Sequence, residues 1–297
     1  MTYSLLFSFL LYSTMLLDDK PAYTLYNKKA KPSTYKELVK TAQEADVVLF
    51  GEFHDNPMSH WLQLQLTKDL HQEKNGKLIL GAEMFETDVQ LVLNEYLSGA
   101  IKESNFEKEA RIWDNYKTDY KPLVVFAKNQ KIPFIATNIP RRYAAAVAQK
   151  GLEVLQTMDT LAKQYYFPPL PVQVDTELPS YKAMLGMMGG GATHSSTPNP
   201  MMPNPYNMVY AQAIKDATMA YKITQYSKAG HTFLHYNGAY HSDNYEGIVW
   251  YLKKYRPELK IVVITTVSQE KIDELSTENT GKADFTICVP ADMTKTY

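Results

Sequence analysis

The sequence predicts an α/β protein: a mainly parallel sheet flanked by helices, with an inserted helical cap. Short runs rich in β-branched and aliphatic residues alternate with longer amphipathic runs, the rhythm of strands and crossover helices in a parallel sheet. One interval between two such runs is too long for a single crossover. The 297 residues, of which 45% are apolar, suffice for one sizeable core or two small ones.

The expected elements follow from these runs in chain order. The apolar runs predict strands at 47–52, 77–85, 132–138, 231–238, 260–267 and 284–290. The stretches between them predict helices at 58–74, 87–98, 120–129, 140–150, 151–164, 206–228 and 244–255. Strands that alternate with helices in this way indicate parallel pairing.

The spacing of the strands divides the chain into a core and a cap. We expect an α/β core at 21–139 and 229–297, and a helical cap at 140–228. Within the cap, 186–205 is rich in Gly and Pro and has no periodicity. That composition predicts a flexible segment, which is either a lid over a ligand or a plain connector.

The N-terminal segment 1–20 is apolar from Leu5 to Leu17. Such a stretch is too short to span a bilayer but has the length of a secretory h-region, so we expect export to the cell envelope, periplasmic or membrane-associated. No Lys or Arg precedes it, and no small-x-small cleavage site or lipid-accepting Cys follows it. A buried N-terminal helix or a truncated start remains the alternative.

Composition excludes several classes of function. The formal charge of −1, without a long Lys/Arg stripe, argues against nucleic acid as a partner. The single cysteine, Cys288, excludes an intramolecular disulfide and a cysteine-cluster metal site, and its apolar surroundings predict a buried, inert thiol. The 22 Tyr and 13 Met suit flat, polarizable ligands, although each one alone is better explained as packing.

Two Gly-x-x-His motifs follow predicted strands. GEFHD places Glu52 and His54 directly after the strand 47–52, and GAYH places His241 after 231–238. Ligands of open α/β sheets collect beyond the carboxyl ends of the strands, so we expect both imidazoles to line one cavity there. We expect each motif's Gly to adopt a backbone conformation closed to other residues and to let a ligand approach. The pair could bind a transition metal, activate water or hold a carboxylate; the alternative is that both only satisfy local backbone groups.

Other charged residues follow the second and third strands. Glu83 ends the second, and Arg141 and Arg142 follow the third, in the first turn of a helix. Cations there are poorly matched to the helix dipole and need another partner. That partner is either a bound anion or the carboxylates of Glu52 and Glu83, and a purely structural ion pair is an equal alternative.

Several stretches resemble the ChaN-type haem-binding lipoproteins. These belong with the Tiki, TraB and erythromycin-esterase proteins in a superfamily marked by two Gly-x-x-His motifs. The matching stretches are VVLFGEFHDNPMSH, LILGAEMFE, WDNYKTDYKPLVVFAKNQKIPFIATNIPR, YAQAIKDATMAYKI and HYNGAYHSDNYEGI, which cover most of 45–267. Their order and spacing carry the resemblance, because no single motif is specific.

The resemblance implies a haem site. It implies haem held between core and cap, commonly at a dimer interface with haems stacked face to face, and iron held by a Tyr phenolate, a hard anionic ligand that favours ferric iron. The tyrosines of the matching stretches are Tyr116, Tyr120, Tyr206, Tyr210 and Tyr240.

Among these tyrosines we favour Tyr206 or Tyr210 as the iron ligand, because they adjoin the predicted lid. By the same resemblance His54, Arg141 and His241 contact the haem propionates or line the pocket, and His194 is a second candidate axial ligand. The lipidated Cys of the family is missing, so membrane anchoring does not follow from the resemblance.

Two functions remain open. The first is a non-catalytic haem carrier or store in bacterial iron acquisition, a homodimer that meets haem-uptake components of the cell envelope. The second is a hydrolase, a peptidase or esterase dependent on a divalent transition metal, in which Glu52 or Glu83 acts as general base while His54 and His241 orient metal or water. The abundance of Tyr and Met and the closer match to the ChaN-type stretches favour the carrier.

Overall fold

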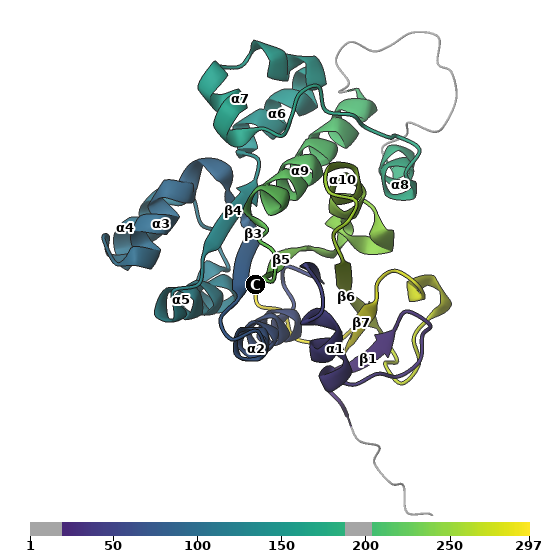
Figure 1. Ribbon diagram of the computed structural model, residues 1–297. Coiled ribbons are helices and arrows are strands. Elements are labelled where there is room, and N and C mark those ends of the chain that lie inside the picture. The colour runs from purple at the N-terminus through teal and green to yellow at the C-terminus, as the bar shows by residue number, and fades with distance from the viewer. Residues whose placement is uncertain (1–19, 188–203) are drawn as a thin grey trace, which may run out of the picture.

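A mostly parallel sheet forms the centre of the protein. The computed structural model describes residues 20–187 and 204–297. Within these ranges the sheet has seven strands in the order β1-β7-β6-β2-β5-β3-β4 (Figure 1). The strands are β1 Thr24–Asn27, β2 Val47–Glu52, β3 Leu78–Glu86, β4 Phe134–Asn138, β5 Thr232–Gly238, β6 Ile261–Gln269 and β7 Phe285–Pro290. Only β1 pairs antiparallel, which confirms the predicted α/β fold.

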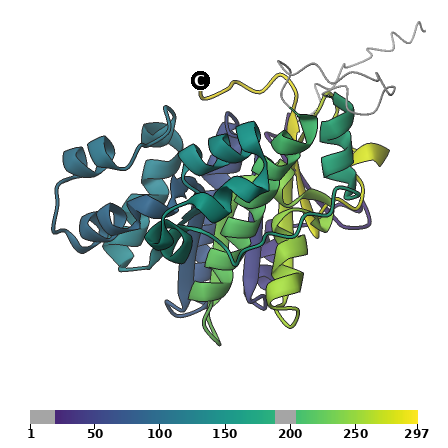
Figure 2. The ribbon, with the colours of Figure 1, turned by 90° about the horizontal axis from the view of Figure 1, so that it is seen from above.

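Helices cover both faces of the sheet. One face carries α1 Tyr35–Ala42, α2 Pro57–Glu73, α3 Gln90–Ser98, α4 Glu103–Glu109 and α5 Lys121–Gln130. The other face carries α9 Pro205–Tyr226 and α10 Ile248–Tyr255, which run over the strands when the molecule is seen from above (Figure 2). Because both faces are covered, the central strands β2 and β5 are buried along their whole length, and most of their residues are apolar.

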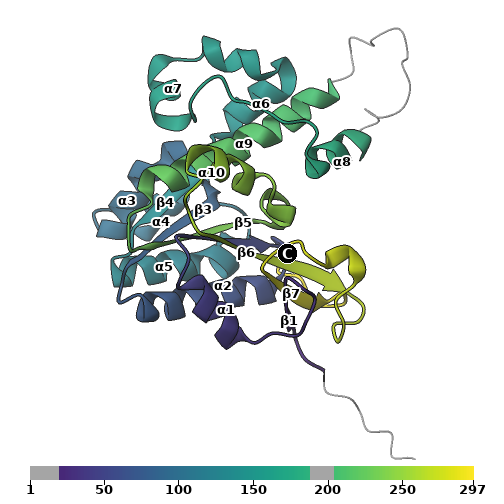
Figure 3. The same cartoon turned by 45° about the vertical axis from the view of Figure 1, so that its right-hand side comes forward.

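The helices α6 Arg141–Lys150, α7 Thr160–Tyr166 and α8 Pro179–Met187 lie beyond α9 (Figure 3). A separate apolar cluster joins α6 and α7 to α9 through Val147, Ala162, Ala211 and Ile214. The opposite side of α9 packs on the sheet. Thus α9 is both the crossover helix that leads into β5 and the platform on which the other helices of 140–228 rest.

Local sequence signals explain the helix boundaries. Asn56 caps α2 by accepting a hydrogen bond from the Ser59 amide at 3.0 Å. The predicted helix 151–164 is wrong as one unit, because Asp159 caps a new helix and separates α7 from a preceding 3-10 turn, Leu152–Thr157. The structure also adds α1, α4 and α8, which the sequence reading missed.

Three predictions fall on residues that the structure does not describe. They are most of the N-terminal segment 1–20, most of the segment 186–205, and His194 within it. At the described ends of 186–205, α8 continues to Met187 and Asn204 caps α9. Among the described residues no helix is long and apolar enough to cross a membrane.

Candidate functional site

The two Gly-x-x-His motifs lie side by side because β2 and β5 are neighbours. In their parallel register Gly51 pairs with Asn237 and Glu52 with Gly238. Both strands therefore end at the same edge, and His54 and His241 line one cavity of about 410 Å³. This confirms the prediction that residues far apart in sequence bring two imidazoles to one hollow.

The glycines of the motifs serve a different purpose from the one predicted. Neither adopts the left-handed conformation: Gly238 has φ −56°, and Gly51 is not among the residues with positive φ. A Cβ at Gly51 would lie 2.9 Å from the Cα of Ala239, and one at Gly238 would lie 2.9 Å from Nε2 of His54. The first glycine thus lets two backbones approach, and the second makes room for an imidazole.

Glu52 holds His54 in place. Its buried carboxylate accepts hydrogen bonds from Nδ1 of His54 at 2.8 Å, from the Tyr120 hydroxyl at 2.6 Å and from the Gln63 amide. Burial lowers the pKa of His54, but the Glu52 carboxylate outweighs burial, and the pKa lies above its ordinary value. With Nδ1 engaged by Glu52, Nε2 is the ring nitrogen left to meet a ligand.

The ring of His54 is further positioned by its own backbone and by an aromatic neighbour. The His54 carbonyl accepts hydrogen bonds from Nε2 of His60 and from the Asn115 amide, each at 2.9 Å. The Trp113 indole meets the His54 ring edge-on, with centroids 5.0 Å apart. About a third of the His54 side chain remains exposed to the cavity. The imidazole is therefore oriented but accessible.

His241 is enclosed by two carboxylates. Nε2 lies 3.1 Å from Glu83 of β3, and Nδ1 lies 2.5 Å from Asp216 of α9. Burial opposes the charged imidazolium, but these carboxylates outweigh it and raise the pKa of His241 to about 10. The Tyr181 hydroxyl donates to the other oxygen of Asp216 at 2.7 Å, and the Gly238 amide donates to Glu83 at 2.8 Å.

These contacts determine what the buried triad Glu83–His241–Asp216 can do. Burial opposes the charge of Glu83, but the His241 cation holds the pKa of that carboxyl far below its usual range. At neutral pH His241 is therefore protonated and donates from both ring nitrogens. A doubly protonated ring has no free lone pair, so in this state His241 donates hydrogen bonds and cannot accept a proton.

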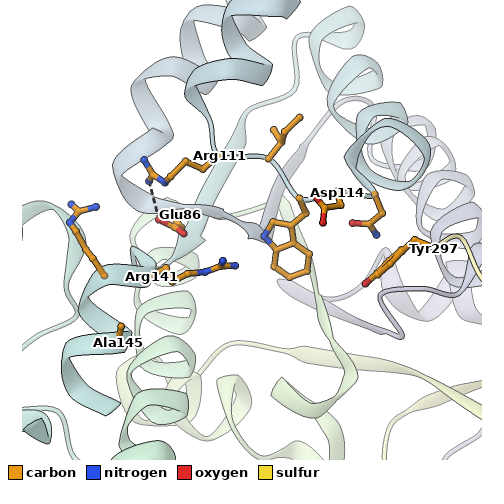
Figure 4. A pocket seen from close by; sticks show the side chains of 10 residues that line it. Glu86, Arg111, Asp114, Arg141, Ala145 and Tyr297 are labelled. Atoms are coloured by element: carbon orange, nitrogen blue, oxygen red, sulfur yellow. Dashed lines mark hydrogen bonds and ion pairs between the residues drawn. The ribbon is translucent and has the colours of Figure 1, made fainter. Parts of the chain in front are cut away.

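A second cavity of about 660 Å³ adjoins the first. Trp113 and Tyr297 are among the residues that line this cavity, and Figure 4 shows Tyr297 at its side. Tyr297 also lines the first cavity. Three arginines also line the second cavity. Arg111 forms ion pairs with Glu86, at 2.9 Å, and with Asp88, and Arg142 also pairs with Asp88.

The third arginine of this cavity, Arg141, forms no ion pair with any described residue. Of the two partners considered for the arginines after the third strand, the carboxylates of Glu52 and Glu83 are not the ones found, because histidines engage both. The acidic partner of Arg142 is Asp88 instead. Arg141 remains available for an anion in the cavity, toward which its side chain points (Figure 4).

The five predicted tyrosines have different surroundings. Tyr116 and Tyr120 are buried, and burial raises the pKa of each phenol well above its ordinary value. Tyr240 lines the histidine cavity and donates a hydrogen bond to the Ser180 carbonyl at 2.6 Å. Tyr206 and Tyr210, in the first turns of α9 with ring centroids 6.4 Å apart, do not line either cavity.

Sequence reasoning missed several residues that build the site. Asp216 and Tyr181 enclose His241 from the cap side, while Trp113 and Tyr297 form cavity walls. Asp216 carried a signal, since it is a lone acid among the small and apolar residues of its helix. Across the described residues, no group of three or more His, Cys, Asp or Glu side chains is arranged to hold a metal ion.

Fold and site together define an α/β protein with paired Gly-x-x-His motifs at the carboxyl ends of neighbouring parallel strands. A family model described as haem-binding uptake, Tiki superfamily, ChaN, matches residues 38–252. Because the match spans most of the chain, the protein belongs to this family, which confirms the resemblance seen in the sequence.

Solved structures show the same fold. One reported for cofacial haem binding to ChaN of Campylobacter jejuni aligns with a TM-score of 0.63 and 17% identity, covering 89% of this chain and 96% of that one. A Bacillus cereus protein aligns with a TM-score of 0.51 and 12% identity, covering 91% and 95%. The search of curated proteins gave no match. At such low identity these likenesses establish the fold alone.

Proposed function

We propose that this protein binds haem at the carboxyl edge of the sheet, in the two adjoining cavities, and serves as a haem carrier or store in bacterial iron uptake. The observation that carries the proposal is the position of His54. Its ring is oriented by Glu52, partly exposed, and turned into a cavity beside Gly238. Membership of the haem-binding uptake family supplies the ligand class.

The lining of the cavities fits a flat apolar ring system. Phe53, Tyr240 and Tyr297 line the histidine cavity with 38%, 42% and 66% of their surface exposed. Exposed aromatic side chains that gather around one cavity form an apolar patch of the kind that marks binding sites. Trp113 continues this surface into the adjoining cavity, whose volume also falls within the range of about 300–1,000 Å³ usual for small-molecule sites.

The charges fit the two carboxylates of haem. Arg141 lies in the adjoining cavity without an ion pair among the described residues, and its guanidinium suits bidentate binding of a carboxylate. His54, with a pKa above its ordinary value, adds a second donor at the other cavity. A propionate bound by Arg141 places the apolar ring against the aromatic side chains between the two cavities.

A tyrosine phenolate supplies the iron ligand in this proposal. Bound ferric haem brings a hard Lewis acid, for which an anionic oxygen is the preferred partner. Tyr116 and Tyr120 are unsuited because they are buried. Tyr240 and Tyr297 line the cavity directly. Tyr206 and Tyr210, in the first turns of α9, do not, and would reach haem only if that haem extends beyond the cavity or belongs to a second copy.

We also propose a homodimer in the cell envelope. Exposed aromatic side chains around an open cavity favour a second copy that covers the outer face of the bound haem. The apolar stretch near the N-terminus supports export, which would place the protein where haem-uptake components operate. Haem titration followed by mass measurement tests the dimer: two haems for every two chains, with the mass doubling on loading, is expected.

Absorption spectroscopy tests the site. Ferric haem added to the apo-protein should give a Soret band and a charge-transfer band typical of phenolate ligation. Tyr→Phe variants at 206, 210, 240 and 297 should identify the ligand as the one whose loss removes the charge-transfer band. Tyr226→Phe, at the other end of α9, is the matched control and should leave the spectrum unchanged. If micromolar haem produces no spectral change in the wild type, the proposed function is wrong.

A further inference from the structure

A cavity of about 760 Å³ lies away from the histidines, between α7, α9 and the 3-10 turn Thr87–Val89. It shares no lining residue with either cavity of the proposed haem site. The lining side chains that matter here are Thr87, Tyr165, Tyr166, Lys222 and Tyr226. Neither the family resemblance nor the paired histidines assign it a role.

Lys222 brings a buried cation to this cavity. Only 8% of the residue is exposed, and Nζ donates hydrogen bonds to the Tyr165 carbonyl at 2.9 Å and to the Gln225 side-chain oxygen at 3.0 Å. An ammonium group has three protons, so one donor is left over. No carboxylate of the described residues lies within 4.0 Å of Nζ.

No carboxylate of the described residues therefore neutralises the charge of Lys222, and its one aromatic contact is the Tyr221 ring, 5.9 Å from Nζ. Burial lowers its pKa to about 8, which still leaves the amine mostly protonated at neutral pH. Asp88 lines the same cavity, but its carboxylate is already shared by Arg111 and Arg142. A buried cation without a counter-charge is unfavourable, and a bound anion would offset that cost.

Thr87 gives a second, independent indication. Its hydroxyl is buried and has no hydrogen-bond partner among the described residues, although almost all buried polar groups in proteins are paired. The residue lines the same cavity as Lys222 and comes from a different element. Two residues with unused hydrogen-bonding capacity, Thr87 and Lys222, thus line one cavity.

We propose that this cavity binds a small organic anion, a carboxylate on a planar or aromatic body, with Lys222 as its counter-ion and Thr87 as a hydrogen-bond donor. The rings of Tyr165, Tyr166 and Tyr226 provide flat surfaces for the body of the ligand. The lone lysine suits a singly charged carboxylate, because phosphate groups carry more charge and favour clustered arginines. This site is independent of haem binding.

Calorimetric titration with benzoate tests the proposal, with uncharged benzamide as the matched ligand. The wild type should bind benzoate saturably and benzamide at least about tenfold more weakly, because the charge-assisted contact is lost. Lys222→Met should weaken benzoate binding by about tenfold or more. Lys228→Met removes an exposed lysine near the same end of α9 and should leave binding unchanged.

A second variant keeps the test valid if Lys222→Met unfolds the protein. Thr87→Val removes a hydroxyl that has no partner, so it should fold normally yet weaken benzoate by about threefold. In a second readout, benzoate should slow acetylation of Lys222 by acetic anhydride and leave Lys228 unaffected, as measured by mass spectrometry. Because the site is independent of haem binding, benzoate should bind equally well to the haem-free protein, to the haem-loaded protein and to the Tyr240→Phe variant.

Three outcomes would overturn the proposal. The first is benzoate binding no tighter than benzamide. The second is benzoate binding that both Lys222→Met and Thr87→Val leave within twofold of the wild type. The third is displacement of benzoate by an equal concentration of inorganic phosphate, which would assign the site to phosphate groups instead.

Discussion

The strongest test of the buried triad Glu83–His241–Asp216 is the removal of its cation. His241→Gln retains a side chain of similar size that can hydrogen-bond, but it leaves the carboxylates of Glu83 and Asp216 buried without a positive charge. Breaking a buried ion pair by removing one partner typically costs about 3–5 kcal/mol. We therefore expect His241→Gln to be among the most destabilising single substitutions at the sheet edge.

The pKa of His241 gives the same magnitude by an independent route. The two carboxylates raise it from 6.5 to about 10 against the opposing effect of burial. At 1.36 kcal/mol per pH unit, this rise corresponds to about 5 kcal/mol of stability at low pH, as an order of magnitude. Urea unfolding at pH 7, extrapolated linearly to water, should show that His241→Gln lowers the free energy of unfolding by about this amount.

The contribution of His241 to the unfolding free energy depends on pH in a predictable direction. Because the pKa of His241 is higher in the folded state than in the unfolded state, its contribution is complete below pH 6.5 and is lost as the pH rises through about 10. The difference in unfolding free energy between wild type and His241→Gln should therefore shrink between pH 7 and pH 10. A difference that stays constant over this range would contradict the charged state assigned to His241.

Two further variants separate charge from packing. Combining His241→Gln with Glu83→Gln removes one unpaired carboxylate and should recover about 2 kcal/mol of the loss. His231→Gln replaces a histidine outside the cavities and should change stability by less than about 0.5 kcal/mol. A loss below about 1 kcal/mol in His241→Gln itself would refute the reasoning.

Three other substitutions test the architecture of the site. Gly51→Ala should destabilise the protein by about 1–3 kcal/mol in urea unfolding, because the new Cβ meets the Ala239 backbone at 2.9 Å; a neutral effect would show that the backbone at Ala239 can move away freely. Gly238→Ala should instead displace the His54 ring and shift the Soret band at similar stability, and an unshifted band would remove His54 from the haem site. Arg141→Met should weaken haem binding and reduce its salt dependence without changing the unfolding free energy, whereas unchanged binding would exclude Arg141 as the propionate partner.

Much of the fold could be predicted from the sequence because buried parallel strands are mostly apolar. All six predicted strands occur within one or two residues of their expected bounds. The strand β1 was missed because it has only four residues and pairs antiparallel at the sheet edge, where it needs no long apolar run. The helix α1 could have been found, since Thr34 and Glu37 form a capping box that is visible in the sequence.

The candidate site was predictable in position but not in its pairings. Strand ends of a parallel sheet meet at one edge, so the meeting of His54 and His241 follows from topology. The partner of His241 does not, because Asp216 reaches it only through the way α9 lies on the sheet. Likewise, the helix dipole predicts that arginines in the first turn of a helix need a partner. The sequence does not identify Asp88 as that partner, because the turn that follows β3 brings Asp88 to Arg142.

The two motifs are alike in sequence and opposite in chemistry, and the elements around them explain why. The Asp216 carboxylate of α9 joins Glu83 against His241, which becomes a buried cation holding the α9 helix to the sheet edge. His54 meets only one carboxylate, keeps a nitrogen free and faces exposed aromatic side chains. A repeated Gly-x-x-His motif therefore specifies where an imidazole is delivered, while the number of carboxylates that meet it decides whether it holds the structure together or remains free to meet a ligand.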